Sequence, residues 1–237
     1  SFGWAGAVMF RRAGCPVSSC DRTDAEPDSL VTEMHGDGHD ALALDREDLS
    51  AVREAGSGMG TIHILVNNSG GPPGGPLLEN TIDEFEGPFR RHLHAAHTIT
   101  QALVPGMEAA GTGRIVNIIS TSVREPIDNI GLSNTLRGAM ASWAKSLSRE
   151  LPACVTINNI MPGFTDTDRL GSLAASTSER TGKPVEDVCD EWMSGVPIQP
   201  LVNPLETAVA VTFLCLPSSG ATRGASLAVD GVRMRSI

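Results

Sequence analysis

Short runs of β-branched and aliphatic residues alternate along this chain with longer amphipathic stretches, and this alternation limits the folds that it can adopt. The runs have the length and composition of strands, and they lie at residues 17–20, 41–44, 62–66, 114–119, 155–160 and 226–229. The amphipathic stretches carry apolar residues every three or four positions, as helices do, at residues 82–110, 132–151 and 204–216, and a helical insertion is expected at residues 169–195. Repeated strand–helix–strand units predict an α/β fold with a doubly wound, mainly parallel sheet covered on both faces, in three α/β/α layers. In such sheets, ligands bind outside the carboxyl ends of the strands.

The beginning of the chain departs from that repeat. Residues 1–13 look like a glycine loop that runs into a helix, so the strand expected before the loop is not in the sequence. Without that strand, both of its neighbours would expose unpaired backbone groups. We therefore expect an upstream segment, and we expect residues 1–237 to belong to a single domain.

Charge and composition narrow the classes of partner. A formal net charge of -10, with 18 Lys and Arg against 28 Asp and Glu, argues against nucleic acids and anionic membranes, which require a clustered positive field. No apolar run approaches the roughly 18 residues of a membrane span, and the first residues lack the pattern of a signal peptide. Five scattered cysteines without a Cys-x-x-Cys pair indicate neither a disulfide framework nor a metal site. We expect a cytoplasmic protein that acts on a small molecule.

A polar turn follows the run at residues 62–66. It reads Asn67-Asn68-Ser69-Gly70, which resembles the Asn-Asn-Ala-Gly signature of the short-chain dehydrogenase/reductases. Four further segments resemble that family in order and spacing: Gly3-Trp4-Ala5 the end of its glycine loop, Asp45 its adenine-binding aspartate, residues 162–167 its Pro-Gly-x-x-x-Thr segment, and residues 229–231 its closing strand. The resemblance covers nearly the whole chain and implies a Rossmann-type fold, in a divergent relative of the β-ketoacyl carrier-protein reductases.

The resemblance also implies a nicotinamide dinucleotide cofactor. Gly3 and Trp4 fall in the loop where glycines let the backbone approach a pyrophosphate, whose charge the helix amino terminus meets. Asp21 stands where a carboxylate would bind the adenosine ribose and repel a 2′-phosphate, which favours NAD(H), although the neighbouring Arg22 leaves NADP(H) open. Alternatively, Asp21 only caps a turn. The other implied cofactor contacts are Asp45 and Arg46 at the adenine, Asn68, Ser69 and Gly70 along the adenosine, and Pro162, Gly163, Thr165 and Thr167, with Thr167 at the carboxamide.

The catalytic residues of the family are altered in this chain, which contains no tyrosine. The family uses Asn, Ser, Tyr and Lys, and its serine aligns with Ser120. Where the Tyr-x-x-x-Lys motif should stand, the chain has Ser133 and Arg137, and residues 138–151 match the helix that follows the motif. The asparagine position is taken by His92.

These substitutions change the chemistry that the site offers. Ser133 is too weak an acid, and too short, to replace the phenol unaided. Arg137 keeps a permanent positive charge that suits an anion or ribose hydroxyls, but it does not exchange protons near neutral pH. His92 is a candidate acid or base near pH 7, although histidines on helices, including His94 and His97, are more often surface or packing residues.

Three functions remain open at this stage. The first is an oxidoreductase for a ketone or alcohol, in which Ser120 polarises the carbonyl and water or His92 delivers the proton. The second is a non-redox lyase, cyclase or dehalogenase-like enzyme, in which Arg137 and Ser120 bind an anion or oxyanion. The third is a catalytically inactive binding protein. The resemblance further implies a homo-oligomer, a dimer or tetramer, that pairs the helices at residues 82–110 and 132–151.

Overall fold

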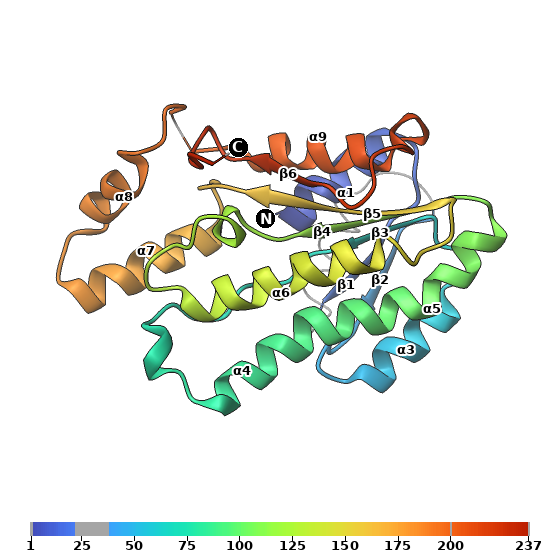
Figure 1. Cartoon of the computed structure of the whole chain (residues 1–237), viewed down its shortest axis with the longest axis horizontal. Coiled ribbons are helices and arrows are strands. Elements are labelled where there is room, and N and C mark those ends of the chain that lie inside the picture. The colour runs from blue at the N-terminus through green and yellow to red at the C-terminus, as the bar shows by residue number, and fades with distance from the viewer. Residues whose placement is uncertain (1, 22–37, 200, 237) are drawn as a thin grey trace.

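The strands of the protein form two parallel sheets in a computed structural model that describes residues 2–21, 38–199 and 201–236 (Figure 1). The two-stranded sheet pairs β1 (Ser18–Asp21) with β2 (Asp40–Ala43). The four-stranded sheet has the order β3-β4-β5-β6, and its strands span Ile64–Asn67, Gly113–Ile118, Val155–Pro162 and Ser226–Val229. Every predicted strand is present, with ends shifted by at most two residues, and the predicted α/β fold is confirmed.

Helices cover both faces of the four-stranded sheet. One face carries α1 (Phe2–Arg12) and α9 (Pro204–Cys215), and the other carries α5 (Ala95–Ala109) and α6 (Gly131–Leu147), with α3 (Leu49–Gly58) packed against α5 (Figure 1). None of the described helices has both the length and the apolar character that a membrane span requires.

Successive side chains of β4 point to opposite faces of the four-stranded sheet. Val116 packs with Phe10 of α1 in one apolar cluster, whereas its neighbour Ile115 packs with Leu103 of α5 in another. Both β4 residues are fully buried. A strand buried on both sides needs apolar residues on both, and in β4 the β-branched Ile115, Val116 and Ile118 supply them and marked the strand in the sequence.

A row of buried amides crosses the four-stranded sheet. Asn67 donates to the side-chain oxygen of Asn117 at 2.9 Å, and Asn117 donates in the same way to Asn159 at 2.9 Å. Asn159 completes the row by donating to the Ser226 hydroxyl at 3.0 Å. These four residues are register partners on β3, β4, β5 and β6. A shift of any strand would break the row, so the amides fix the register of the sheet.

Two of the predicted helical stretches are interrupted. Residues 82–110 divide into α4 (Ile82–Phe89), a π-helical turn (Arg90–His94) and α5. Pro88, which has no N–H to donate, lies two residues before the widened turn begins. The insertion at residues 169–195 forms α7 (Asp168–Thr181) and α8 (Val185–Met193), because α7 ends at Gly182 with a positive φ of 72°.

The two-stranded sheet is much less covered. All residues of β4 and β5 are buried, whereas those of β2 are exposed or half-buried. Helix α1 begins at Phe2, so Gly3 and Trp4 lie in its first turn rather than in a loop. The strand expected before residue 1 lies outside the sequence and stays a prediction.

Candidate active site

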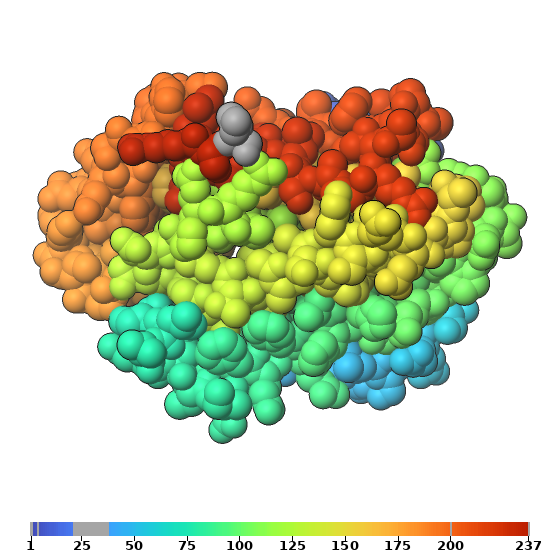
Figure 2. All heavy atoms as spheres, viewed as in Figure 1, coloured from blue at the N-terminus to red at the C-terminus, as the bar shows by residue number. Residues whose placement is uncertain are grey.

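A cavity of about 680 Å³ opens at the carboxyl ends of β4 and β5. Its volume lies in the range of small-molecule sites, roughly 300–1,000 Å³. Helices α7 and α8, orange in Figure 2, form the end of the molecule beside it, next to the yellow-green segment that leads from β4 into α6. Seven of the predicted site residues line this cavity, namely Ser120, Ser133, Arg137, Pro162, Gly163, Thr165 and Thr167.

Ser120 follows the last residues of β4. Its backbone is extended, and its Oγ accepts a hydrogen bond from the Ser122 N–H at 3.1 Å, which caps a short 3₁₀ turn. The hydroxyl proton of Ser120 has no acceptor among the described residues, so it is free to be donated into the cavity.

Ser133 and Arg137 lie one turn apart on α6 and therefore share a face of the helix. They are only 8% and 9% exposed. Arg137 donates from Nη1 to the Ile118 carbonyl oxygen at 2.7 Å and from Nη2 to the Ser69 carbonyl oxygen at 2.9 Å. Arg137 thus ties the end of β4 to the turn after β3.

Arg137 remains charged at neutral pH. Burial, and secondarily the positive charge of Arg169, lower its pKa to about 10. Arg137 therefore places a permanent cation at the wall of the cavity.

His92 is held in the π-helical turn, 4% exposed, and its Nε2–H donates to the Gly70 carbonyl oxygen at 2.8 Å. Burial, and then the charge of Arg137, lower its pKa from 6.5 to about 3. This lowered pKa argues against the predicted role of His92 as an acid or base near pH 7, because the ring is neutral there and binds protons only weakly. His92 is not among the residues that line the cavity, and its contact fixes the turn after β3.

The segment after β5 is held rigidly against the end of β6. A Cβ on Gly163 would lie 2.7 Å from the Asp230 Cα, so only glycine fits there. Thr165 donates to the Gly163 carbonyl oxygen at 3.1 Å, and Thr167 caps α7 by accepting from the Leu170 N–H at 3.4 Å.

The residues assigned to the adenosine are not among those that line this cavity. Arg46 donates to the Asn68 carbonyl oxygen at 2.7 Å and to Ser69 Oγ at 2.9 Å, and its buried Nε has no partner among the described residues. Asp45 accepts from the Glu47 N–H at 2.9 Å. The structure therefore joins Arg46 to the Asn68–Ser69 turn but leaves both groups outside the residues that line the cavity.

Two predicted residues near the amino terminus are described only in their backbone. Trp4 belongs to α1 and Asp21 closes β1, but their side chains, and all of Arg22, lie outside the described residues.

Sequence reasoning missed several residues of the cavity. Phe164 and Trp192 stack with ring centroids 5.7 Å apart, and the arginines Arg169 and Arg233 also line the cavity. Arg169 comes two residues after Thr167, and Arg233 two after Gly231. Their closeness to recognised motifs was the only signal that could have found them.

Comparisons with known proteins agree with this fold and with the family that the motifs resemble. The profile of the family described as enoyl-(acyl carrier protein) reductase matches residues 1–231. The chain therefore belongs to this family of short-chain dehydrogenases/reductases, as its motifs predicted.

Individual relatives match over nearly their full length. The short-chain reductase protein NovJ of Streptomyces niveus is 30% identical over 240 residues, covering 98% of this chain and 89% of that protein. An uncharacterised oxidoreductase of Mycobacterium tuberculosis is 29% identical over 236 residues, covering 97% of this chain and 86% of that protein. A crystal structure of an actinorhodin polyketide ketoreductase variant with NADPH superposes with a TM-score of 0.92 and 25% identity, covering 99% of this chain and 94% of that one.

Proposed function

We propose that the protein is a nicotinamide-dependent oxidoreductase that interconverts a small ketone and its alcohol through a non-standard active site. One observation carries the proposal. A single cavity joins Ser120, Ser133 and Arg137, at the catalytic positions of the family, to the 162–167 segment at its cofactor position. The oxidoreductase relatives support the same class of reaction.

The residues of the cavity fit a nicotinamide dinucleotide. Phe2, the first residue of the 11-residue helix α1, lines the same cavity as Thr165 and Thr167, so helix N–H groups and threonine hydroxyls are available to phosphate and carboxamide. When bound, this cofactor supplies or removes a hydride at the carbonyl carbon. We assign NAD(H) on the charge of Asp21, while the similar ketoreductase contains NADPH.

In this proposal Ser120 donates its hydroxyl proton to a hydrogen bond with the carbonyl oxygen. The nearby charge of Arg137 lowers the free energy of the negative charge that develops on that oxygen. The chain has no tyrosine, and His92 is neutral, so the proton comes from water in the cavity, for which Ser133 Oγ is a hydrogen-bond partner. Proton transfer is therefore the weak step of this enzyme.

The buried charge of Arg137 also favours a second candidate, a non-redox lyase, cyclase or dehalogenase-like enzyme. A permanent cation beside a free hydroxyl stabilises an anionic intermediate whether or not hydride moves. The inactive binding protein is the remaining alternative.

The test is the oxidation of NADH and NADPH with a panel of ketones, followed by nicotinamide absorbance. Ser120→Ala is expected to lower kcat by on the order of a hundredfold, because it removes the donor to the developing oxyanion. Ser176→Ala, which alters an exposed residue of α7 at the same cavity, is the matched control and should leave kcat unchanged. Turnover without nicotinamide oxidation would favour the non-redox enzyme, and ligand binding without turnover the binding protein.

We further propose a cytoplasmic homo-oligomer, as composition and the family resemblance predict. Of the apolar residues that suggested an interface, Met140 is buried in the core, while Leu93 and Trp143 are partly buried against it. Light scattering that gives the mass of a single chain would contradict the oligomer.

A further inference from the structure

The cavity concentrates positive charge within an acidic chain. Six basic and two acidic residues line it, although the whole sequence carries 18 Lys and Arg against 28 Asp and Glu. The two acidic residues offset only part of this charge, because Glu191 pairs with Lys183, one of the six, at 2.6 Å and Asp128 is exposed to solvent. A positive, partly enclosed surface attracts anions.

Two arginines at the inner part of the cavity carry this charge without a counter-ion. Arg137 is nine-tenths buried, and its Nη atoms bind neutral carbonyl oxygens. Arg169, half-buried on α7, donates to the Pro72 carbonyl oxygen. Among the described residues, neither has a carboxylate within ion-pair distance.

The two guanidinium groups are close enough to repel each other. The charge of Arg169 lowers the pKa of Arg137, and burial lowers the pKa of both. Burying two cations side by side raises the free energy of the empty site, and a bound anion removes that cost.

Arg169 also lies beside a catalytic position. A Cβ on Gly71 would be 3.3 Å from Arg169 Nη2 and 3.7 Å from Ser133 Oγ, so the guanidinium and the hydroxyl flank the same point. An anion held by Arg169 is therefore close to Ser133, and so to the carbonyl group that the proposed function places at Ser120 and Ser133.

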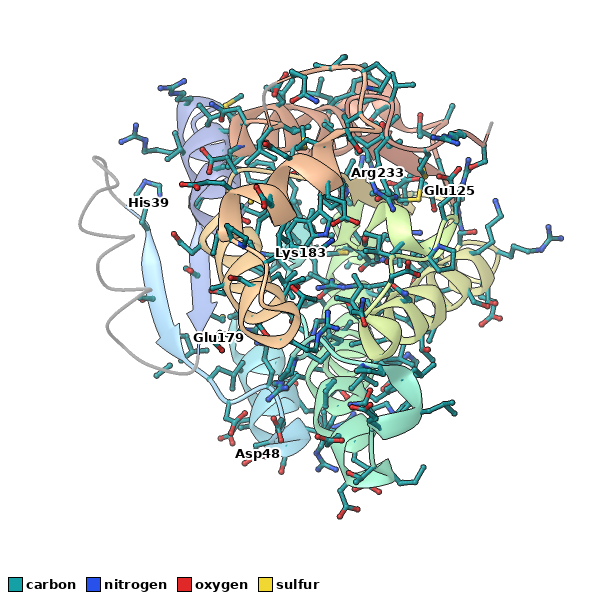
Figure 3. The ribbon with its side chains drawn as sticks, turned by 90° about the vertical axis from the view of Figure 1, so that its left-hand side faces the viewer. His39, Asp48, Glu125, Glu179, Lys183 and Arg233 are labelled. Atoms are coloured by element: carbon teal, nitrogen blue, oxygen red, sulfur yellow. The ribbon has the colours of Figure 1, made fainter. Side chains whose placement is uncertain are left out.

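The other basic residues of the cavity are engaged or exposed. Arg233 lies beside Glu125 (Figure 3), is attracted by Glu125 and Asp230, and stacks 5.3 Å over the Phe164 ring. The remaining three are exposed: Arg180 on α7, Lys183 just after α7, and Arg235 near the carboxyl terminus. These four residues are thus paired with acidic groups or exposed, whereas Arg137 and Arg169 are neither.

We propose that the substrate is an oxo acid whose carboxylate binds at Arg169, next to the charge of Arg137, with its carbonyl group at Ser120. The planar fork of Arg169 suits a carboxylate, which accepts two parallel hydrogen bonds from it. The assignment of the carbonyl rests on the proposed oxidoreductase function, whereas the carboxylate site rests on the two arginines.

The experiment is calorimetric titration of the cofactor-free protein with 2-oxobutanoate and with its methyl ester. The acid is expected to bind about tenfold or more tightly than the ester, because hydrogen bonds to charged groups are stronger than neutral ones. Arg169→Met should abolish the difference, and Arg169→Lys should keep part of it, since the charge remains without the fork. Arg180→Met removes an exposed arginine from the same helix and should leave the difference intact.

Equal binding of acid and ester to the unaltered protein would overturn the proposal. It would also be overturned if Arg169→Met weakens NADPH binding but preserves the acid–ester difference, because the arginine would then serve a cofactor phosphate. Since the titration contains no cofactor, carboxylate binding without any nicotinamide oxidation would support this site while refuting the oxidoreductase.

Discussion

The two sheets of this protein are built in different ways. At the carboxyl end of the four-stranded sheet, buried side chains hold the backbone: Arg137 binds the carbonyl groups of Ile118 and Ser69, and His92 binds that of Gly70. The two-stranded sheet is held by parallel backbone pairing, and the side chains of β2 are exposed or half-buried. Substitutions at the first sheet should therefore change stability and catalysis together, whereas those at the second should change stability less and act mainly on cofactor affinity.

The strongest test of this contrast is the row of amides. Asn117→Ala leaves the Asn67 donor and the Asn159 acceptor unpaired inside the protein, which should lower the free energy of unfolding by about 3 kcal/mol. Leu42→Ala, in the half-buried β2, should cost about 1 kcal/mol. Urea denaturation measures both.

A cycle with Asn159→Ala sharpens this test. The double variant Asn117→Ala with Asn159→Ala should lose less stability than the sum of the two single variants, because the hydrogen bond between the two residues is lost only once. Additive losses, or an equal loss for Leu42→Ala, would contradict the contrast between the sheets.

The second prediction concerns catalysis at the carboxyl end of the four-stranded sheet. Ser133→Tyr combined with Arg137→Lys restores the phenol and ammonium of the family, and it should raise carbonyl reduction by on the order of a hundredfold. Initial rates with NADH and a ketone panel measure the gain, with each single variant as a control. A double variant that folds and binds cofactor without any gain would show that the site has diverged beyond a lost proton donor.

The third prediction uses the pKa of His92, which is lowered from 6.5 to about 3 in the folded protein. The unfolded chain takes up this proton as the pH falls below 6.5 and the folded protein does not, so stability is lost in that direction. The loss from His92 between about pH 7.5 and pH 5 is about 2 kcal/mol.

His92→Asn removes the titrating ring and keeps an amide that can donate to Gly70. Its free energy of unfolding should fall less over the same interval, as followed by urea denaturation at each pH. Identical pH profiles for the two proteins would mean that His92 is not kept neutral by burial.

The smallest expected effect lies at the two-stranded sheet. Asp21→Ala should shift the ratio of NADH to NADPH affinity by about tenfold toward NADPH, because it removes the charge that opposes a 2′-phosphate. Calorimetric titration with both cofactors measures the ratio, and the free energy of unfolding should not change. An unchanged ratio would remove Asp21 from the cofactor site.

The sequence predicted the fold well, because buried strands such as β4 and β5 are rich in β-branched residues and alternate with amphipathic helices. It also predicted the residues that meet at the cavity from β4, α6 and the 162–167 segment, since these follow recognisable motifs. It failed where a property depends on surroundings. The intrinsic pKa of histidine suggested an acid, and only the burial of His92 beside Arg137 reverses that inference. Arg169 stayed hidden because its proposed role comes from the fold, which brings it and Ser133 to Gly71, and all three lie far apart in the sequence.

The row of amides has a consequence for how this chain can change over generations. Asn67, Asn117, Asn159 and Ser226 belong to four strands but form one hydrogen-bonded set. Replacing one member leaves the donors and acceptors of its neighbours without hydrogen-bond partners. Replacing all of them with apolar residues of similar shape is nearly neutral for stability. The four positions are thus epistatic: we expect lineages to keep or lose them together, through intermediates that are less fit than either end state.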